Sequence, residues 1–301
     1  MFFFKIFSII RFIIKNPLSK NRKFNSLLRF IIWQISSTLF IKKFCFKWID
    51  DSMLIAYKGE AAIVGNLYTG LMEFNDMAFL LHYLNRKDVF VDVGANSGAY
   101  TVLASKVIRS KSISIEPIKK SYKRIIEHIK INKIEHLVSL HNCGIGKKAG
   151  KLFFTNNNDS MNRVVHDHCE ESTSLCKIKT LNSLLNKKNF YVIKIDTEGF
   201  EYNVLKGADE ILKRGNIIAI IVELNGCGKT YGFTNNDVHK ELLSYGYFPI
   251  NYDPIFRKIK KKVSIKFVNN NVIYVKDISI AKKRCSKSKS RLVHAAYGIK
   301  I

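Results

Sequence analysis

Residues 89–101 read Val-Phe-Val-Asp-Val-Gly-Ala-Asn-Ser-Gly-Ala-Tyr-Thr, and this stretch decides the fold. A short apolar strand ends in a tight turn that contains Gly94 and Gly98, and a helix with apolar periodicity follows. A strand, a glycine turn and a helix in this order are typical of the cofactor-binding start of a doubly wound α/β fold.

The residues of the turn indicate which kind of cofactor it binds. A dinucleotide fingerprint would place its second glycine at Asn96, and an acid, Asp92, stands two residues before the first glycine. A carboxylate there repels a diphosphate and attracts a cation. S-adenosylmethionine (SAM) carries a sulfonium and an ammonium, and turn amides at a helix N-terminus can bind its carboxylate. We therefore expect Asp92, Gly94, Ala95, Asn96 and Gly98 to bind SAM.

A second acid supports a nucleoside cofactor. The apolar residues 112–115 precede Glu116-Pro117, and Glu116 lies 18 residues after Gly98. An acid at about this distance hydrogen-bonds ribose hydroxyls in such folds. The alternative interpretation is an ordinary strand-to-helix turn followed by a surface acid.

A third acidic stretch, residues 192–201, reads Val-Ile-Lys-Ile-Asp-Thr-Glu-Gly-Phe-Glu. Lys194 lies inside an apolar strand, where a buried ammonium is costly unless it is paired. Asp196, Glu198 and Glu201 follow it closely. The alternative for Glu198 and Glu201 is that they only stabilise a helix N-terminus.

Four acids are expected where apolar strands end, namely Asp92, Glu116, Asp196 and Glu223. Ligands of open α/β sheets bind beyond the carboxyl ends of the strands, so these acids should converge on one crevice. That arrangement suits a cationic cofactor and a nucleophile that must lose a proton. The candidate catalytic residues are Asp196, Glu198, Lys194 and Glu223, with Asp196 or Glu198 as the base.

The rest of the chain alternates between strand and helix patterns. Strands are expected at residues 90–93, 112–115, 137–141, 151–155, 191–195, 217–223, 248–250 and 272–275, and helices at residues 68–84, 97–108, 119–130, 201–212 and 236–245. A polar loop is expected to run from residue 156 to about residue 177. This pattern predicts an α/β fold with a doubly wound, mostly parallel sheet and an N-terminal helical extension.

Composition suggests three segments. Residues 1–50 form an apolar, basic helical extension, residues 51–275 the catalytic domain, and residues 276–301 a basic tail. No uncharged apolar run is long enough to span a membrane. The helices within residues 1–45 could lie on a membrane surface or pack on the catalytic domain, and both alternatives stay open.

The net charge of +26 comes from 50 basic and 24 acidic side chains, and Lys far outnumbers Arg. Nucleic acid is one candidate partner for such a charge, but a lysine-rich solvated surface needs no partner. Residues 251–254, Asn-Tyr-Asp-Pro, are not a base-flipping motif of the Asn-Pro-Pro-Tyr type.

The six cysteines are scattered without a Cys-x-x-Cys pair, which favours a reducing, cytoplasmic location, with contact to the inner face of the membrane left open. The stretch His166-Asp167-His168-Cys169 does not match the spacing of structural zinc sites. No metal site is therefore expected.

The motifs together resemble the FkbM family of class I SAM-dependent methyltransferases. The resemblance rests on residues 89–101, 115–117, 193–201, 204–208 and 221–223. It implies SAM as cofactor and methyl transfer, usually to a hydroxyl of a sugar or a natural product, and it places an adenine contact at Asn142. The family often has Thr-Leu-Asp before its fourth strand, whereas this chain has Asn182 in place of the acid.

We therefore expect a SAM-dependent O-methyltransferase that acts on a sugar hydroxyl of a cell-surface glycan or a related small molecule. A nucleic-acid methyltransferase is the first alternative, because of the basic charge. A non-catalytic scaffold at the membrane surface is the second.

Overall fold

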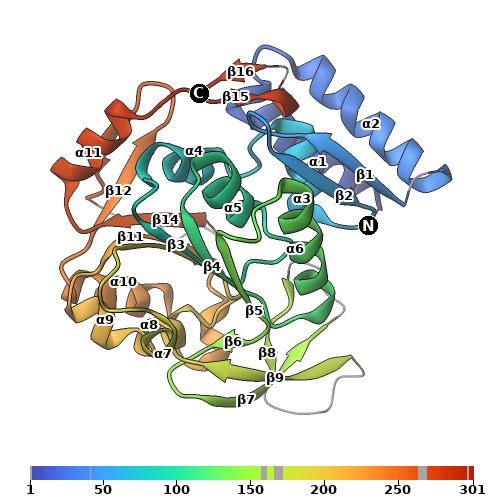
Figure 1. The fold of residues 1–301 in the computed structure, drawn as a ribbon. Helices are drawn as coiled ribbons and strands as arrows, with labels where there is room; N and C mark the ends of the chain where they lie inside the picture. Colours follow the sequence, from blue (N-terminus) through green and yellow to red (C-terminus); the bar gives the residue numbers. More distant parts are fainter. Residues whose placement is uncertain (1, 41, 157–160, 166–171, 264–269, 297) are drawn as a thin grey trace.

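The computed structural model describes residues 2–40, 42–156, 161–165, 172–263, 270–296 and 298–301. Its centre is an eight-stranded sheet with the order β13-β12-β14-β11-β10-β3-β4-β5 (Figure 1). The five parallel strands are β3 (Val89–Val93), β4 (Lys111–Ile115), β5 (Val138–His141), β10 (Tyr191–Ile195) and β11 (Ile217–Leu224). The chain runs outward from β3 to β5 and returns to β10, directly beside β3.

Three antiparallel strands complete the sheet beyond β11. They are β14 (Asn270–Val275), β12 (Phe248–Asp253) and β13 (Lys258–Lys261). The prediction of a doubly wound, mostly parallel α/β sheet is confirmed.

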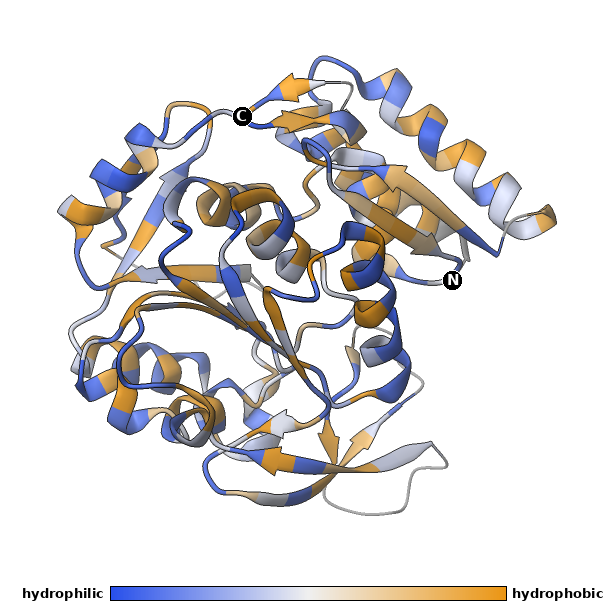
Figure 2. Ribbon diagram, in the orientation of Figure 1, coloured by the Kyte–Doolittle hydropathy of each residue, from blue (hydrophilic) through white to orange (hydrophobic). Residues whose placement is uncertain are grey.

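Helices cover both faces of the sheet, so its central strands are apolar on both sides (Figures 1 and 2). Along β3, Phe90 packs into one core and its neighbours Val89 and Val91 pack into the other. The first core includes α4 (Phe74–Tyr83), α5 (Ala99–Val102) and α11 (Ile278–Lys287), and the second includes α8 (Glu201–Lys206), α9 (Asp209–Lys213) and α10 (Asn235–Ser244).

Two predicted helices are each interrupted at a glycine, one because of its backbone conformation and the other because of close packing. The helix expected at 68–84 is wrong as one element, because Gly70 takes a φ of 86° between α3 (Ala61–Thr69) and α4. The helix expected at 201–212 is divided at Gly207, which packs against the backbone oxygen of Gly146 so closely that a Cβ would lie 2.1 Å from it. The helix at 97–108 starts at Ala99 and ends as a π-helix, Leu103–Ile108.

A small second sheet follows β5, with the order β6 (Gly144–Ile145), β9 (Thr173–Lys179), β7 (Gly150–Thr155) and β8 (Val164–Val165). The prediction of a polar loop up to residue 177 is wrong for β8 and β9. β8 has only two residues, and the sequence of β9 is mixed in polarity, so neither indicates a strand by itself; both form by pairing with β7. This sheet closes over the end of the central sheet through Phe154 and Val164.

The N-terminal extension consists of α1 (Phe2–Lys15), the 3-10 turn Pro17–Ser19, α2 (Lys23–Leu39) and β1 (Lys43–Lys47), which pairs with β2 (Met53–Tyr57). Ile13, Leu18 and Trp33 belong to the same apolar core as α4. Among the described residues, no helix has both the length and the apolar character needed to cross a membrane.

The C-terminal residues fold back onto this extension (Figure 1). Arg291 forms an ion pair of 2.9 Å with Asp50, and the His294 backbone N–H donates to the Trp48 oxygen at 2.8 Å. β15 (Leu292–Val293) pairs with β16 (Ile299–Lys300). The boundaries at residues 50 and 275 stay predictions.

Candidate functional site

A cavity lies at the carboxyl ends of β3 and β10, where the order of the parallel strands reverses. This is the point at which open α/β sheets bind their ligands. The sequence-predicted residues that line the cavity are Asp92, Gly94, Ala95, Asn96, Glu116, Lys194, Asp196, Glu198 and Glu223. α3 contributes Ala62 and Ile63 to the wall, and the small second sheet contributes Phe154 and Val164.

The turn after β3 has an unusual backbone. Gly94 and Gly98 have φ values of 79° and 84°, and Asn96 between them has a φ of 49°. Only glycine adopts this left-handed region without strain, and asparagine is among the side chains that tolerate it best. Asn96 thus meets the conformational need of a glycine and adds a side chain to the cavity wall.

Asp92 is buried beneath this turn, with 2% of its surface exposed. Its carboxylate accepts a hydrogen bond of 2.8 Å from the Thr101 hydroxyl, which also contacts the Ser114 hydroxyl at 2.6 Å. Burial raises the pKa of Asp92 to about 6, while the charge of Lys194 on the adjacent strand opposes that rise. A bound cation would favour the ionised carboxylate in the same way.

The Glu116 side chain connects the turn after β3 with the turn after β4. One carboxylate oxygen accepts from the Asn96 backbone N–H at 2.8 Å, and the other accepts from the Ile118 backbone N–H at 2.9 Å. Burial raises the pKa of Glu116 to about 8 despite these hydrogen bonds. Each oxygen keeps lone-pair capacity for a further donor such as a ribose hydroxyl.

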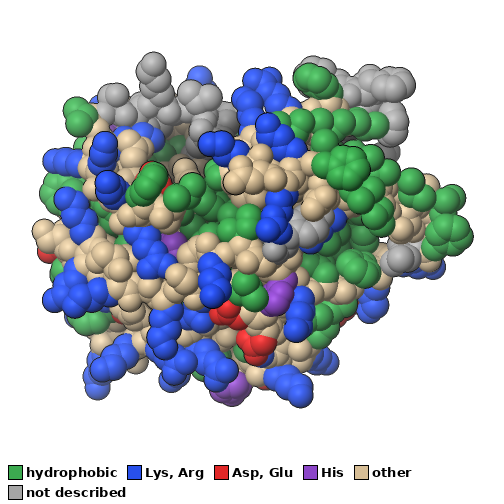
Figure 3. Space-filling model, turned by 90° about the horizontal axis from the view of Figure 1, so that it is seen from above, with side chains coloured by type: hydrophobic (Ala, Val, Ile, Leu, Met, Phe, Trp, Pro, Cys, Tyr) green, Lys and Arg blue, Asp and Glu red, His purple; other side chains and the backbone are tan. Residues whose placement is uncertain are grey.

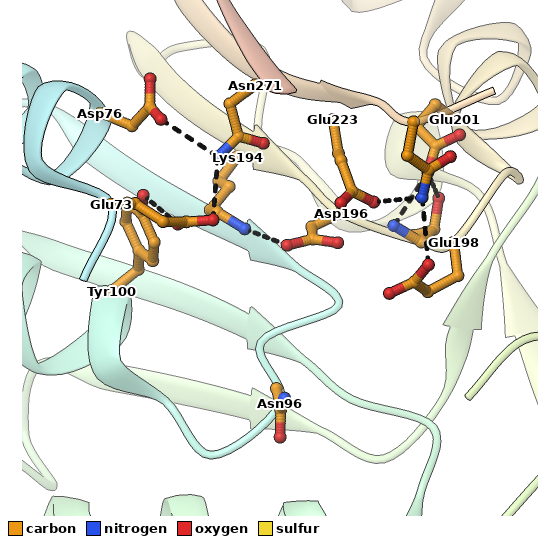
Figure 4. A network of polar contacts seen from close by, with 12 residues as sticks. Glu73, Asp76, Asn96, Tyr100, Lys194, Asp196, Glu198, Glu201, Glu223 and Asn271 are labelled. Carbon is orange, nitrogen blue, oxygen red and sulfur yellow. Dashed lines mark hydrogen bonds and ion pairs between the residues drawn. The ribbon is translucent and has the colours of Figure 1, made fainter. Parts of the chain in front are cut away.

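Lys194 forms an ion pair, as its place inside an apolar strand predicted. Its Nζ lies 2.5 Å from a carboxylate oxygen of Asp196 and 4.8 Å from the centre of the Tyr100 ring (Figure 4). Nearby carboxylates, of which Asp196 is the nearest, raise the pKa of Lys194 against the effect of burial, so the ammonium stays charged. The pair therefore places a fixed positive charge beside the cavity.

A polar network extends from Lys194 toward α4 (Figure 4). The Tyr100 hydroxyl donates to Glu73 at 2.6 Å. The Asn271 amide donates to Glu73 at 3.0 Å and to Asp76 at 3.2 Å. Since Glu73 and Lys194 both line the cavity, this network forms the wall on its α4 side.

The loop after β10 is organised by Glu201. A single carboxylate oxygen of Glu201 accepts from the Thr197 N–H, the Thr197 hydroxyl and the Gly199 N–H, each at 3.0 Å. This loop carries Glu198 at a φ of 53°. Glu201 is therefore a positioning residue, which is more than the helix-dipole role that its place in the sequence suggested.

Glu198 and Glu223 are bridged by the side chain of Asn225. The Asn225 amide donates to Glu198 at 3.1 Å and to Glu223 at 2.8 Å. Burial, followed by the charge of Asp196, raises the pKa of Glu198 to about 7. The same causes raise the pKa of Glu223, so the neighbouring carboxyl groups of Glu198 and Glu223 together retain a proton near neutral pH.

Oxygen atoms of Asp196, Glu198 and Glu223 all lie within 4.8 Å of one another. Three carboxylates at this spacing could provide ligands for a hard divalent cation. Lys194 already supplies one positive charge to this group through Asp196. The prediction that no metal is required stays a prediction, and His166–Cys169 lie outside the described residues.

Two predicted cofactor residues do not line the cavity. Gly98 lies between the lining residues Ser97 and Ala99 and, with a φ of 84°, is the N-cap residue of α5. Asn142 is exposed, and its amide donates to the backbone oxygens of Glu116 at 2.8 Å and Pro117 at 3.0 Å. The next residue, Cys143, reaches the cavity instead.

Sequence reasoning did not identify the residues of the α4 wall. Glu73 and Tyr100 stood in helical patterns and were read as part of their periodicity, while Asp76 and Asn271 carried no local signal. Glu73 and Asn271 are 198 residues apart in the chain, so only the sheet pairing brings them together.

The charges of the cavity fit SAM. Among the described residues, six carboxyl groups line it, from Glu73, Asp92, Glu116, Asp196, Glu198 and Glu223, against one ammonium, that of Lys194. The cavity wall is thus acidic, although the protein as a whole has a net charge of +26. A ligand with a sulfonium and an ammonium is attracted to such a wall, whereas a diphosphate is repelled.

Solved structures with a similar arrangement include several methyltransferases. An rRNA methylase from Streptococcus thermophilus is 12% identical, with a TM-score of 0.38, over 66% of this chain and 93% of that one. TYW2 of M. jannaschii, in complex with AdoMet, is 15% identical, with a TM-score of 0.39, over 78% and 85%. The precorrin-6y C5,15-methyltransferase from Geobacter metallireducens is 12% identical, with a TM-score of 0.37, over 68% and 86%.

No curated protein sequence matches the chain. A family model does match it, the methyltransferase FkbM domain, over residues 92–249. This range is more than half of the 301 residues and runs from Asp92 through the loop after β10 to β12. The protein is accordingly a SAM-dependent methyltransferase, and its chain belongs to the methyltransferase FkbM domain family.

Proposed function

We propose that this protein methylates a hydroxyl group of a sugar, on a cell-surface glycan or a related small molecule. The observation that carries the proposal is the group of Asp196, Glu198 and Glu223 at the edge of the cavity. A hydroxyl becomes an effective nucleophile only as it loses its proton, so it needs a base within hydrogen-bond reach. The family resemblance supports a sugar as the carrier of that hydroxyl.

Among the three acids, Glu198 is best suited to be the base. Asp196 is engaged by Lys194 at 2.5 Å, and burial with the charge of Asp196 raises the pKa of Glu223 well above its ordinary value. Glu198, with a pKa of about 7, is ionised in part and can accept a proton near physiological pH. Glu223 and the Lys194 ammonium then act as donors that orient the substrate oxygen.

When bound, SAM would supply a methyl group on a sulfonium, with S-adenosylhomocysteine as the leaving group. The residues of the chain hold the oxygen in line, and the hydroxyl proton moves to the carboxylate of Glu198. Phe154, Val164 and Ile63 reduce the access of water to the cavity. Catalysis is thus mostly positioning, supported by one proton transfer.

The acidic lining of the cavity disfavours the nucleic-acid alternative, because carboxylates that are ionised there repel a phosphate backbone. The direct experiment incubates the protein with methyl-labelled SAM and one of two acceptor classes. The first is a mixture of neutral oligosaccharides and surface polysaccharide, and the second is RNA at matched concentration. Label in an alkali-stable ether on a sugar supports the proposal. Label in RNA alone would establish the alternative.

The Glu198→Gln variant separates catalysis from binding. It should bind SAM with unchanged affinity in calorimetry and lose about 10²–10⁴-fold in kcat. A wild-type protein that binds no SAM at millimolar concentration would instead favour the scaffold alternative.

A further inference from the structure

Helix α2 has two opposed apolar faces, of which one is buried. Phe30 and Trp33 pack into the core, with 6% and 5% exposed. On the other side, six large apolar side chains are 43–76% exposed: Phe24, Leu28, Ile31, Ile32, Ile35 and Leu39. At about 100° per residue, these six fall within an arc of about 100°, opposite to Phe30 and Trp33. Packing on the domain therefore leaves a complete apolar stripe in contact with water.

The stripe continues onto neighbouring elements. Phe40, directly after α2, is 82% exposed, Phe7 on α1 is 65% exposed, and Phe44 on β1 is also exposed. Seen from above, apolar side chains gather on the side of the molecule where α2 lies, with Lys and Arg side chains nearby (Figure 3). Contiguous exposed apolar surface of this kind marks an interaction site.

The charge of this segment identifies the partner. Residues 1–49 contain ten Lys and Arg residues and no Asp or Glu. A helix with an apolar face and only basic charges around it suits the boundary of a bilayer that contains anionic lipids. No described helix is long and apolar enough to cross a membrane, so α2 would lie along the surface.

The stripe is only one helix away from the cavity. On its buried side, α2 contacts α3: Phe30 stacks edge-on against Tyr68 at 5.4 Å, and Gln34 donates to the Tyr68 hydroxyl at 3.1 Å. On α3, Ala62 and Ile63 line the cavity. A surface that docks through α2 therefore lies beside the wall of the active site.

We propose that the exposed stripe of α2, with Phe7, Phe40 and Phe44, docks on the surface of an anionic lipid bilayer. The apolar side chains enter the boundary between headgroups and acyl chains, and the basic residues of the segment contact lipid phosphates. This inference concerns lipid binding and does not depend on which acceptor is methylated.

The test is co-sedimentation of the full chain with vesicles of phosphatidylcholine alone or with about one third phosphatidylglycerol. We expect binding to the anionic vesicles, and at least a tenfold loss of partitioning in the Ile31→Glu/Ile35→Glu variant. These side chains are 50% and 53% exposed, so the variant should keep the wild-type Tm. The matched control is Ile255→Glu/Phe256→Glu, whose side chains are both 69% exposed and precede the basic run of residues 257–262.

The control variant should bind vesicles within twofold of the wild type. Three outcomes would overturn the proposal. Equal loss in both variants, or in neither, would mean that binding is electrostatic and not specific to α2. A wild-type dimer that becomes monomeric in the Ile31→Glu/Ile35→Glu variant, without vesicle binding, would identify the stripe as a self-association face. Loss of RNA binding in that variant, again without vesicle binding, would assign the face to nucleic acid.

Discussion

A Cβ atom added to Gly94 would lie 1.8 Å from the backbone oxygen of Asp196. The turn after β3, on the cofactor side of the cavity, is therefore in direct backbone contact with the loop after β10, on the catalytic side. Neither segment can move without displacing the other. The residue at position 94 must also adopt a φ of 79°. Glycine is required there for two independent reasons.

The Gly94→Ala variant should lose both stability and SAM binding, because the methyl group forces the two loops apart. The control is Gly232→Ala, where φ is 80° and a Cβ would meet no atom within 4 Å. Backbone strain alone should cost the control about 1–2 kcal/mol, and Gly94→Ala should cost more than about 3 kcal/mol. Urea unfolding and calorimetry with SAM check this, and equal costs would contradict the close contact.

Replacement of Asp92 tests the cofactor assignment. Asp92→Ala removes a buried carboxylate that faces Lys194 and Thr101, and SAM affinity should fall at least about tenfold, because a cationic ligand loses a counter-charge at the turn. Asp51→Ala, which removes an acid with 65% of its side chain exposed, should leave the affinity within twofold. Normal SAM binding by a folded Asp92→Ala protein would show that the assignment is wrong.

The pH dependence of kcat should report Glu198. Because burial and neighbouring charges raise its pKa to about 7, kcat should fall about tenfold per unit as the pH decreases below that value. The positive charge of bound SAM moves this limb toward lower pH. Glu198→Gln should lack the limb, whereas Glu210→Gln, at an exposed position, should keep it. A limb that persists in Glu198→Gln would assign the base to another acid.

The stability of the ligand-free protein should decrease as the pH rises above 6.5. The pKa of Glu116 is raised to about 8 in the folded state by burial, so between its unfolded value and pH 8 the folded state binds more protons than the unfolded state. The lowered pKa values of His82 and His128, each about 4 because of burial, have the opposite effect only below pH 6.5. Thermal unfolding from pH 6.5 to 9 should show a falling Tm, with a shallower slope in Glu116→Gln.

Metal removal should not affect the reaction. Lys194 neutralises Asp196, and a proton retained by the Glu198–Glu223 pair removes a second charge, so the three acids need no cation to lie close together. Methyl transfer measured with EDTA should equal the rate without it, and added Mg²⁺ or Mn²⁺ should not increase it. A rate that EDTA abolishes and Mg²⁺ restores would show that the acids bind a metal.

Sequence reasoning succeeded where the signal was local. The strand, the turn and the helix around Asp92 follow from neighbouring residues, and the acids near Asp196 follow one strand, so their convergence could be predicted from the rules of parallel sheets. The sequence did not predict that Glu201 organises the loop after β10, because its three hydrogen bonds depend on the loop conformation.

The rest of the site depends on tertiary pairing. β14 carries Asn271 to the edge of β11, beside Glu73 on α4, and neither residue shows this in its own segment. The exposed position of Asn142 likewise follows from the way β5 ends, since the chain enters the second sheet two residues later, at Gly144. Such contacts join segments that are far apart in the chain, and no periodicity or motif in either segment indicates that they meet.

The ion pair between Asp50 and Arg291 joins residues 241 positions apart. During synthesis, at about 5–20 residues per second, Arg291 leaves the ribosome roughly 10–50 s after Asp50. The N-terminal helices must therefore wait for most of the chain before their final anchor is available. Through that interval the apolar stripe of α2 is held by its contacts with α3 but lacks the C-terminal anchor, so a bilayer near the ribosome could capture it before the methyltransferase domain has finished folding.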